Sequence, residues 1–137
     1  MRLVSAVLGA DSSDNRFSSA ISLFDYGFSN YKNQAVLDKS VTLNDEFILY
    51  GGKKKTYLVY PEKDAYIFGK KGQTREVNFV VTDYKVKAPV SKGQVVGKID
   101  IYTDNVLHST VNVISAEDIG KANFADRLKE ISYNWAL

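Results

Sequence analysis

The chain has 137 residues, 18 basic and 16 acidic side chains, a net charge of +2 and no cysteine. This length fits one domain, or one domain with a fragment of another, and suffices to bury about two-thirds of the unfolded surface. The balanced charge excludes the electrostatic footprint of a nucleic-acid-binding protein, and the lack of cysteine excludes disulfides and thiolate metal sites. No apolar stretch is long enough to span a bilayer.

An apolar run, Leu3-Val-Ser-Ala-Val-Leu8, follows the first two residues directly, and we expect no secretory leader within this sequence. Such a run is typical of a strand that is buried on both faces of a sheet. We therefore expect residues 2–8 to form a strand that is parted from its neighbours. Because unpaired strand edges are templates for association, this strand should pair with a second copy of the chain or dock on the β-rich part that follows.

An amphipathic helix is predicted next. Residues 11–14 are typical helix-capping residues, and Ser13 is the expected cap. Apolar side chains then recur at steps of three and four residues, at Phe17, Ile21, Phe24, Phe28 and Tyr31. Gly27 should weaken this helix by about 1 kcal/mol relative to Ala, so the helix needs packing against a larger body. Lys32 is expected to be a solvated lysine that complements the helix dipole.

From residue 35 onward, short apolar runs alternate with turn residues. The candidate strands are 35–43, 47–50, 56–60, 65–68, 76–82, 85–90, 95–102 and 106–113. Thr103-Asp-Asn105 predicts a hairpin turn, Gly93 should take a positive φ, and Gly97 suits a bulge. Strands of this number and spacing favour a mainly β fold, a small antiparallel β-sandwich or barrel.

Residues 116–137 are predicted to form a second amphipathic helix. Ser115-Ala-Glu-Asp118 has the spacing of a capping box. The apolar side chains that follow step by four, three and four residues, at Phe124, Leu128, Ile131 and Trp135. The opposite face is only weakly cationic, whereas a strong interfacial helix is longer and more basic. The apolar face therefore either contacts a membrane or a partner, or packs on the β domain, and the sequence leaves both open.

Four segments, taken together and in this order, carry a family resemblance. They are RLVSAVLGA at residues 2–10, NRF at 15–17, LFDYGF at 23–28 and APVSKGQVVGK at 88–98. In these segments the chain resembles the D-alanyl-D-alanine carboxypeptidases, the low-molecular-mass penicillin-binding proteins. The resemblance covers almost the whole chain.

The resemblance implies three parts. Residues 1–33 would be the last strand and helix of the penicillin-binding catalytic domain. The rest of that domain, which is missing from this sequence, would be the partner of the chain. Residues 34–115 would be the C-terminal β-sandwich domain, and residues 116–137 the amphipathic C-terminal helix. In that family a segment after the β domain anchors the enzyme to the outer face of the cytoplasmic membrane. The implied location is therefore extracytoplasmic, in the bacterial cell envelope.

The family's catalytic residues lie in Ser-x-x-Lys, Ser-x-Asn and Lys-Thr-Gly, in that chain order. Ser29-Asn-Tyr-Lys32 and Ser13-Asp-Asn15 match the first two patterns, but in reversed order, and one Ser-x-x-Lys is expected by chance. Lys-Thr-Gly is absent, and the nearest run is Lys55-Thr-Tyr57. We expect no catalytic residue and no enzymatic activity here, whereas the intact parent would be a serine-type carboxypeptidase.

Metal and cofactor sites are not predicted. His108 is the only histidine and lies in a predicted strand, with nothing in the sequence to place a nucleophile beside it. The carboxylates are scattered and match no calcium-loop spacing.

The sequence thus predicts the non-catalytic C-terminal region of a D-alanyl-D-alanine carboxypeptidase, acting in peptidoglycan maturation as a pedestal that positions the catalytic domain. The alternative is a stand-alone β module that binds cell-wall polymer or protein. Its signal would be exposed rings of Tyr57, Tyr60 and Tyr66 beside the lysine clusters at 53–55 and 70–71. Those clusters also have a simpler interpretation, as solvated tips that discourage edge pairing.

Overall fold

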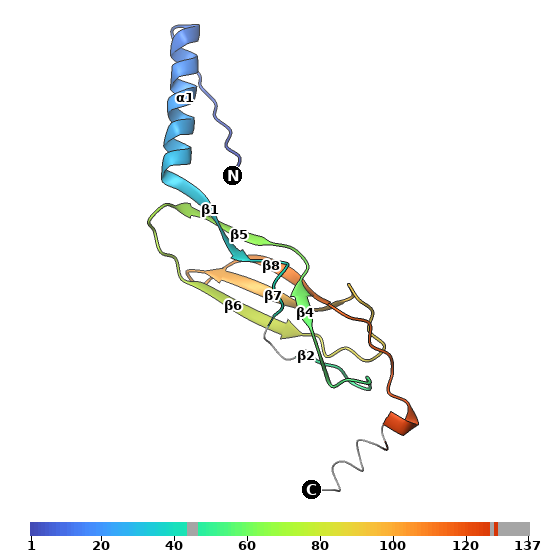
Figure 1. Ribbon diagram of the computed structural model, residues 1–137. Coiled ribbons are helices and arrows are strands. Elements are labelled where there is room, and N and C mark those ends of the chain that lie inside the picture. The colour runs from blue at the N-terminus through green and yellow to red at the C-terminus, as the bar shows by residue number, and fades with distance from the viewer. Residues whose placement is uncertain (44–46, 127, 129–137) are drawn as a thin grey trace. The chain divides into compact units, whose positions relative to one another are not determined.

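The computed structural model describes residues 1–43, 47–126 and 128. Within them the chain is mainly β with antiparallel strand pairing, as the sequence predicts (Figure 1). The elements in chain order are α1 (Ser13–Asn30), β1 (Tyr31–Leu37), β2 (Phe47–Ile48), β3 (Thr56–Tyr57), β4 (Val59–Pro61), β5 (Ala65–Lys70), β6 (Val77–Asp83), β7 (Val95–Thr103) and β8 (Val106–Ser115). They fall into two compact units, unit 1 with Met1–Val36 and Tyr66–Arg75, and unit 2 with Leu37–Ala65 and Glu76–Leu137.

In unit 1, the N-cap of α1 lies one residue before the predicted one. The side chain of Ser12 accepts a hydrogen bond from the main-chain N–H of Asn15 at 3.2 Å. The prediction of Ser13 as the cap is wrong, because its hydroxyl accepts from the Arg16 guanidinium at 2.9 Å instead. Both positions are occupied by serine, so residue type alone does not distinguish them.

The carboxyl end of α1 also differs from the prediction. The helix ends at Asn30, so Tyr31 and Lys32 lie in β1 and do not extend the helical stripe or complement the helix dipole. Lys71, in the turn after β5, takes that role. It donates from its main-chain N–H to the Asn30 carbonyl and from Nζ to the Phe28 carbonyl, each at 2.7 Å.

The segment before α1 is extended, but residues 1–8 pair with no strand in the described part of the chain. The predicted sheet strand is therefore wrong, because an apolar run does not by itself supply a strand partner. The segment lies along α1 instead (Figure 1). Leu3 fills the space above Gly27, where an added Cβ would lie 2.5 Å from Leu3 Cδ1. On the outward side, Val4 and Leu8 are 89% and 93% exposed.

Unit 1 also contains a two-stranded sheet of β1 and β5. The Tyr31 ring at the start of β1 stacks on the Phe68 ring of β5, with centroids 5.3 Å apart and an interplanar angle of 7°. This contact holds the carboxyl end of α1 next to the strand that leads to Lys71.

Unit 2 is built on a four-stranded sheet with the order β4-β8-β7-β6, in which all neighbours are antiparallel (Figure 1). The predicted hairpin turn between β7 and β8 is confirmed, since Asp104 and Asn105 have φ values of 50° and 66°. Gly93 has the expected positive φ of 82°. The register shift between Val95 and Gly97 is the expected bulge.

The β2–β3 pair packs against this sheet through Phe47. Ile99, Ile101, Val111 and Val113 are at most 1% exposed and supply the core side of β7 and β8. Phe47 of β2 is also 1% exposed, and its ring lies against Gly97. A Cβ at Gly97 would lie 2.7 Å from Phe47 Cε1. The Phe47 ring can therefore pack against β7 at this position only because Gly97 has no side chain.

The predicted strand at residues 85–90 is wrong. Lys85 has a φ of 51°, which breaks an extended strand at its start. Two isolated bridges remain in this stretch, a parallel one between Tyr50 and Lys87 and an antiparallel one between Val90 and Ile119. Residues 85–90, in which lysines alternate with apolar residues, therefore form a loop that is held by these two bridges.

Candidate functional site

The chain leaves the sheet of unit 2 through residues 116–122, which we call the attachment segment. It does not extend freely from β8, because main-chain hydrogen bonds tie it to three other stretches of unit 2. The pairs are Ala116 with Leu58, Ile119 with Val90, Gly120 with Lys53 and Ala122 with Gly51, at donor–acceptor distances between 2.8 and 3.2 Å. The start of the C-terminal helix is thus held beside the β2–β3 loop.

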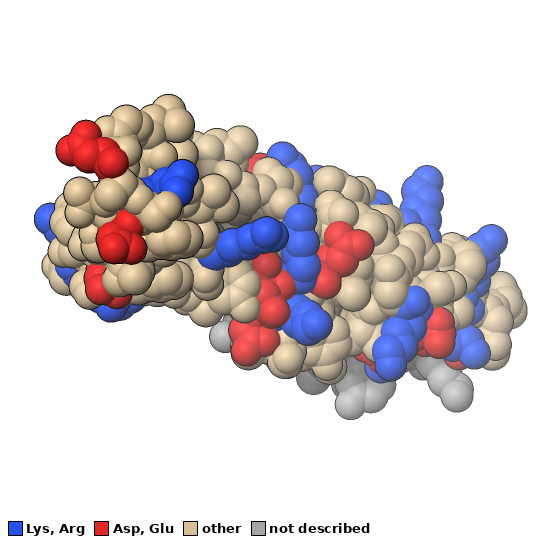
Figure 2. Space-filling view, turned by 90° about the horizontal axis from the view of Figure 1, so that it is seen from above, with Lys and Arg blue, Asp and Glu red and all other residues tan. Residues whose placement is uncertain are grey.

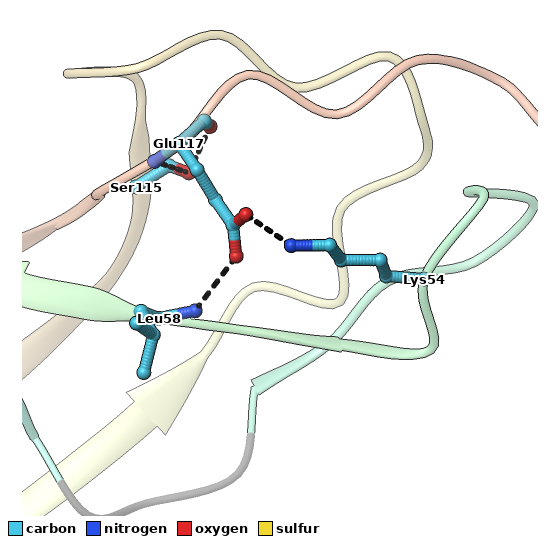
Figure 3. A network of polar contacts seen from close by, with 4 residues as sticks. All are labelled: Lys54, Leu58, Ser115 and Glu117. Carbon is cyan, nitrogen blue, oxygen red and sulfur yellow. Dashed lines mark hydrogen bonds and ion pairs between the residues drawn. The ribbon is translucent and has the colours of Figure 1, made fainter.

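A side-chain network strengthens this attachment (Figure 3). Glu117 forms an ion pair with Lys54 of the β2–β3 loop, and its other carboxylate oxygen accepts the Leu58 N–H at 3.5 Å. Hydrogen bonding from Lys54 holds the pKa of the Glu117 carboxyl below its usual value. Sequence reasoning missed this residue, because nothing in the sequence pairs positions 54 and 117.

Ser115 shapes the first turn of the attachment segment. Its hydroxyl donates to the Glu117 carbonyl at 2.8 Å and accepts from the Glu117 N–H at 3.3 Å, at the buried end of β8. The capping box predicted at Ser115–Asp118 is therefore wrong, since the serine makes a local turn after a strand. The reciprocal capping pair lies eight residues further on, where Asn123 and Asp126 exchange side-chain to main-chain hydrogen bonds at 2.8 and 3.0 Å.

The predicted apolar face begins directly after this cap. Phe124 is 78% exposed and Leu128 is 50% exposed, and both lie in helical backbone. Ile131 and Trp135 lie outside the described residues. Of the described side chains of this face, Phe124 is largely open to solvent and Leu128 is half exposed.

The candidate catalytic residues are not brought together. Ser29 lies in the last turn of α1 and Lys32 lies in β1, so the helix ends between them and they are not one helical turn apart. Ser13, Asp14 and Asn15 form the first turn of the same helix and serve its amino-terminal end. His108 is exposed on β8.

The three tyrosines of the alternative interpretation have different environments. Tyr57 is buried, with 6% exposure, Tyr60 is partly buried and Tyr66 is 52% exposed. Burial raises the pKa of the Tyr57 phenol to about 12, and the negative charge of Asp83 adds to this effect. Tyr57 is a core residue and does not belong to an exposed aromatic platform.

A second polar cluster lies on β7 and β8. Asp100 accepts hydrogen bonds from Lys98 Nζ at 2.7 Å and from the Thr110 hydroxyl at 2.6 Å. Hydrogen bonding from Lys98 and then from Thr110 lowers the pKa of Asp100, and the same contact raises the pKa of Lys98. The hydrogen-bonding groups of Lys98, Asp100 and Thr110 are therefore paired with one another on the surface of the sheet.

The described residues contain neither a metal-binding cluster nor a membrane-spanning helix. No group of three or more His, Cys, Asp or Glu side chains is placed to hold a metal ion among residues 1–43, 47–126 and 128. In the same part of the chain, no helix is both long and apolar enough to cross a membrane.

Comparison with known proteins gives a consistent result. The D-alanyl-D-alanine carboxypeptidase DacA of Haemophilus influenzae is 28% identical over 130 residues, covering 93% of this chain and 33% of the relative. DacF of Bacillus subtilis is 28% identical over 139 residues, covering 98% of this chain and 35% of the relative. The chain thus spans about a third of the length of the curated relatives that it matches.

Solved structures agree with the sequence comparison. Penicillin-binding protein 5 from Haemophilus influenzae matches with a TM-score of 0.65 and 25% identity, over 84% of this chain and 34% of that one. PBP3 from Streptococcus pneumoniae, a peptidoglycan synthesis regulatory factor, shares the fold with a TM-score of 0.62 and 22% identity, over 82% of this chain and 35% of that one. The family model described as "Penicillin-binding protein 5, C-terminal domain" matches residues 31–121, and the chain therefore belongs to this family.

Proposed function

We propose that the chain serves as the non-catalytic C-terminal region of a D-alanyl-D-alanine carboxypeptidase and holds the catalytic domain in position at a membrane surface. The parent enzyme would trim terminal D-alanine from peptidoglycan precursors in the bacterial cell envelope, outside the cytoplasm. Membership of the C-terminal domain family and the names of the relatives support this assignment.

The attachment segment is the observation that carries the positioning role. A domain that positions a catalytic domain above a membrane needs a fixed connection to its membrane-binding element. Here the segment that leads to Phe124 is tied to the β2–β3 loop by main-chain bonds and by the Lys54–Glu117 ion pair. This fixed connection is what we expect of a domain that keeps the catalytic domain at a set distance from the membrane.

The apolar face that begins at Phe124 and Leu128 is the proposed membrane contact. Exposed aromatic and aliphatic side chains on one helical face fit the acyl boundary of a bilayer. We expect the full chain to co-sediment with lipid vesicles. The double variant Phe124→Ser with Leu128→Ser should bind at least about tenfold more weakly, given roughly 0.8 kcal/mol per buried CH₂.

The matched control changes two exposed apolar residues elsewhere. Val106 and Leu107 on β8 are 69% and 52% exposed, so Val106→Ser with Leu107→Ser removes similar apolar surface. Equal loss of binding in both double variants, or vesicle binding that neither variant changes, would refute the membrane contact at this face.

The positioning role has its own test. Glu117→Gln should loosen the attachment segment, so amide hydrogen exchange at Ile119 and Ala122, whose N–H groups donate to Val90 and Gly51, should speed up while exchange in β7 stays unchanged. Unchanged exchange at both amides would show that the ion pair does not hold the segment. A fluorescent penicillin should fail to acylate the chain, and stable labelling would overturn the non-catalytic assignment.

A further inference from the structure

Lysines are concentrated in three stretches of unit 2, and we call this region the lysine end. The stretches are residues 50–55, 84–92 and 116–122. Together they hold seven lysines: Lys53, Lys54, Lys55, Lys85, Lys87, Lys92 and Lys121. Only the first three are consecutive in the sequence, and the other four lie 30 or more positions further along the chain.

The fold brings the three stretches side by side. A parallel bridge joins Tyr50 to Lys87, and an antiparallel bridge joins Gly52 to Lys121. Lys53, which follows Gly52, donates its main-chain N–H to the Gly120 carbonyl at 3.2 Å. Lysines that are separated by up to 68 positions in the sequence therefore share one end of the unit.

The carboxylates at the lysine end are already used within the fold. Glu117 pairs with Lys54, and Asp118 accepts the Lys92 main-chain N–H at 2.8 Å. Asp83 accepts the main-chain N–H of Lys85 at 2.8 Å. The three stretches themselves contain seven lysines and two carboxylates, Glu117 and Asp118, which is a formal charge of +5, while the whole chain carries +2. In the described part of the chain, no acidic side chain pairs with Lys53, Lys87 or Lys121.

The basic side chains are also accessible. Lys53, Lys87 and Lys121 are all exposed. Figure 2 shows one face of the molecule, on which basic and acidic side chains are interspersed. Exposed apolar rings border the same region. Tyr50 is 47% exposed, and Phe124, three residues after Lys121, is 78% exposed.

We propose that the lysine end binds the phosphate headgroups of an anionic phospholipid surface. The proposal deepens the proposed function and rests on it, because it gives the folded unit its own membrane contact beside the helical one. The combination of cations with exposed rings favours a bilayer over a soluble polyanion, since a polyphosphate polymer offers the rings nothing apolar. Two weak contacts of different kinds make a firmer attachment than either one alone.

Vesicle binding of the full chain tests this proposal. Phosphatidylcholine vesicles are compared with vesicles that also contain phosphatidylglycerol. The triple variant Lys53→Gln, Lys87→Gln, Lys121→Gln should lose most of the preference for anionic vesicles, on the order of fivefold for each lysine. The control variant Lys32→Gln, Lys63→Gln, Lys70→Gln makes the same change of charge at exposed positions elsewhere and should keep the preference. Added salt should weaken the binding of wild type to anionic vesicles.

The outcomes separate this inference from the proposed function. If the triple variant keeps the anionic preference, or the control loses it equally, the lysine end is not the site. If Phe124→Ser with Leu128→Ser abolishes binding while the lysine variants do not, the membrane contact stands and this inference falls. If a soluble glycerol phosphate polymer binds as tightly as the anionic vesicles and by the same lysines, the assignment to lipid is overturned.

Discussion

Lys71 caps the carboxyl end of α1 by donating a hydrogen bond from Nζ to the carbonyl oxygen of Phe28 at 2.7 Å, across 43 positions of sequence. Its main-chain N–H donates to Asn30 at the same distance. The last carbonyls of a helix lack partners within the helix and carry partial negative charge. One residue of a remote turn thus supplies both a donor and a cation where the helix itself has no basic residue in its last turn.

Replacing this lysine should destabilise unit 1. We expect Lys71→Met to lower the free energy of unfolding by about 1 kcal/mol, because it removes an exposed, charge-assisted hydrogen bond and keeps the main-chain one. Urea unfolding followed by helical circular dichroism measures the change. Lys70→Met alters the neighbouring exposed lysine and should have little effect. Equal destabilisation by both substitutions would show that Lys71 has no capping role.

The same contact shows where sequence reasoning stops. The amphipathic period predicted α1, and the Asp104-Asn105 turn predicted the β7–β8 hairpin, because both signals are local. The Lys71 cap and the Lys54–Glu117 ion pair join residues that only tertiary folding brings together. No pattern in one sequence encodes such pairs.

Errors in the predicted elements have a related cause. Ser115 and Asp118 have the spacing of a capping box, yet the same spacing at Asn123 and Asp126 forms the real one. Short polar side chains form hydrogen bonds with the nearby main chain in several conformations. The tertiary structure therefore decides which of two such motifs begins a helix. For the candidate site, the apolar face was predicted from its period, whereas the attachment that positions it was not.

Gly97 is expected to be the least replaceable glycine of unit 2. A Cβ there would collide with the Thr82 carbonyl oxygen, which is main chain and cannot move aside, and with the Phe47 ring. Gly97→Ala should lower the free energy of unfolding by about 3 kcal/mol, the upper range for overpacking. Urea titration at neutral pH measures this loss.

Gly93 provides the control for this substitution. Its φ is +82° and no heavy atom lies within 4 Å of an added Cβ. Gly93→Ala should therefore cost only the backbone strain of about 1 kcal/mol. If both substitutions cost the same, the contact between Phe47 and Gly97 would not be tight.

Tyr57 should titrate later than an ordinary tyrosine. Its pKa is raised from 10.0 to about 12, first by burial and then by the charge of Asp83. Because the folded pKa lies above the unfolded one, the fold favours the protonated phenol: stability is unaffected by this group below pH 10 and falls as the pH rises toward 12. Phenolate absorbance should show one late-titrating phenol that Tyr57→Phe removes.

Two variants check the assignment of that phenol. Asp83→Asn should move the late phase to lower pH, because it removes the neighbouring negative charge. Tyr84→Phe removes an exposed phenol and should leave the late phase unchanged. The Tyr57 hydroxyl has no hydrogen-bond partner in the described part of the chain, so Tyr57→Phe should not reduce stability at neutral pH. Loss of the late phase in Tyr84→Phe would contradict the assignment.

The N-terminal segment is expected to mediate self-association. Residues 1–8 are extended, their outward side chains Val4 and Leu8 are largely exposed, and α1 beneath them has no buried residue. An extended edge without a strand partner is a template for pairing with an identical edge, and antiparallel pairing about Ser5 keeps the half-buried residues of both copies on one face.

We therefore expect the average molecular mass measured by sedimentation equilibrium to rise with the protein concentration. Val4→Lys places a lysine on the outward face of both paired strands, and these like charges oppose pairing, so the equilibrium should shift toward monomer by about fivefold in dissociation constant, equivalent to about 1 kcal/mol. Val106→Lys introduces the same charge at another exposed valine, on β8, and should leave the association unchanged. A wild-type chain that stays monomeric at every concentration would sink this prediction, because the exposed edge would then have no affinity for its own copy.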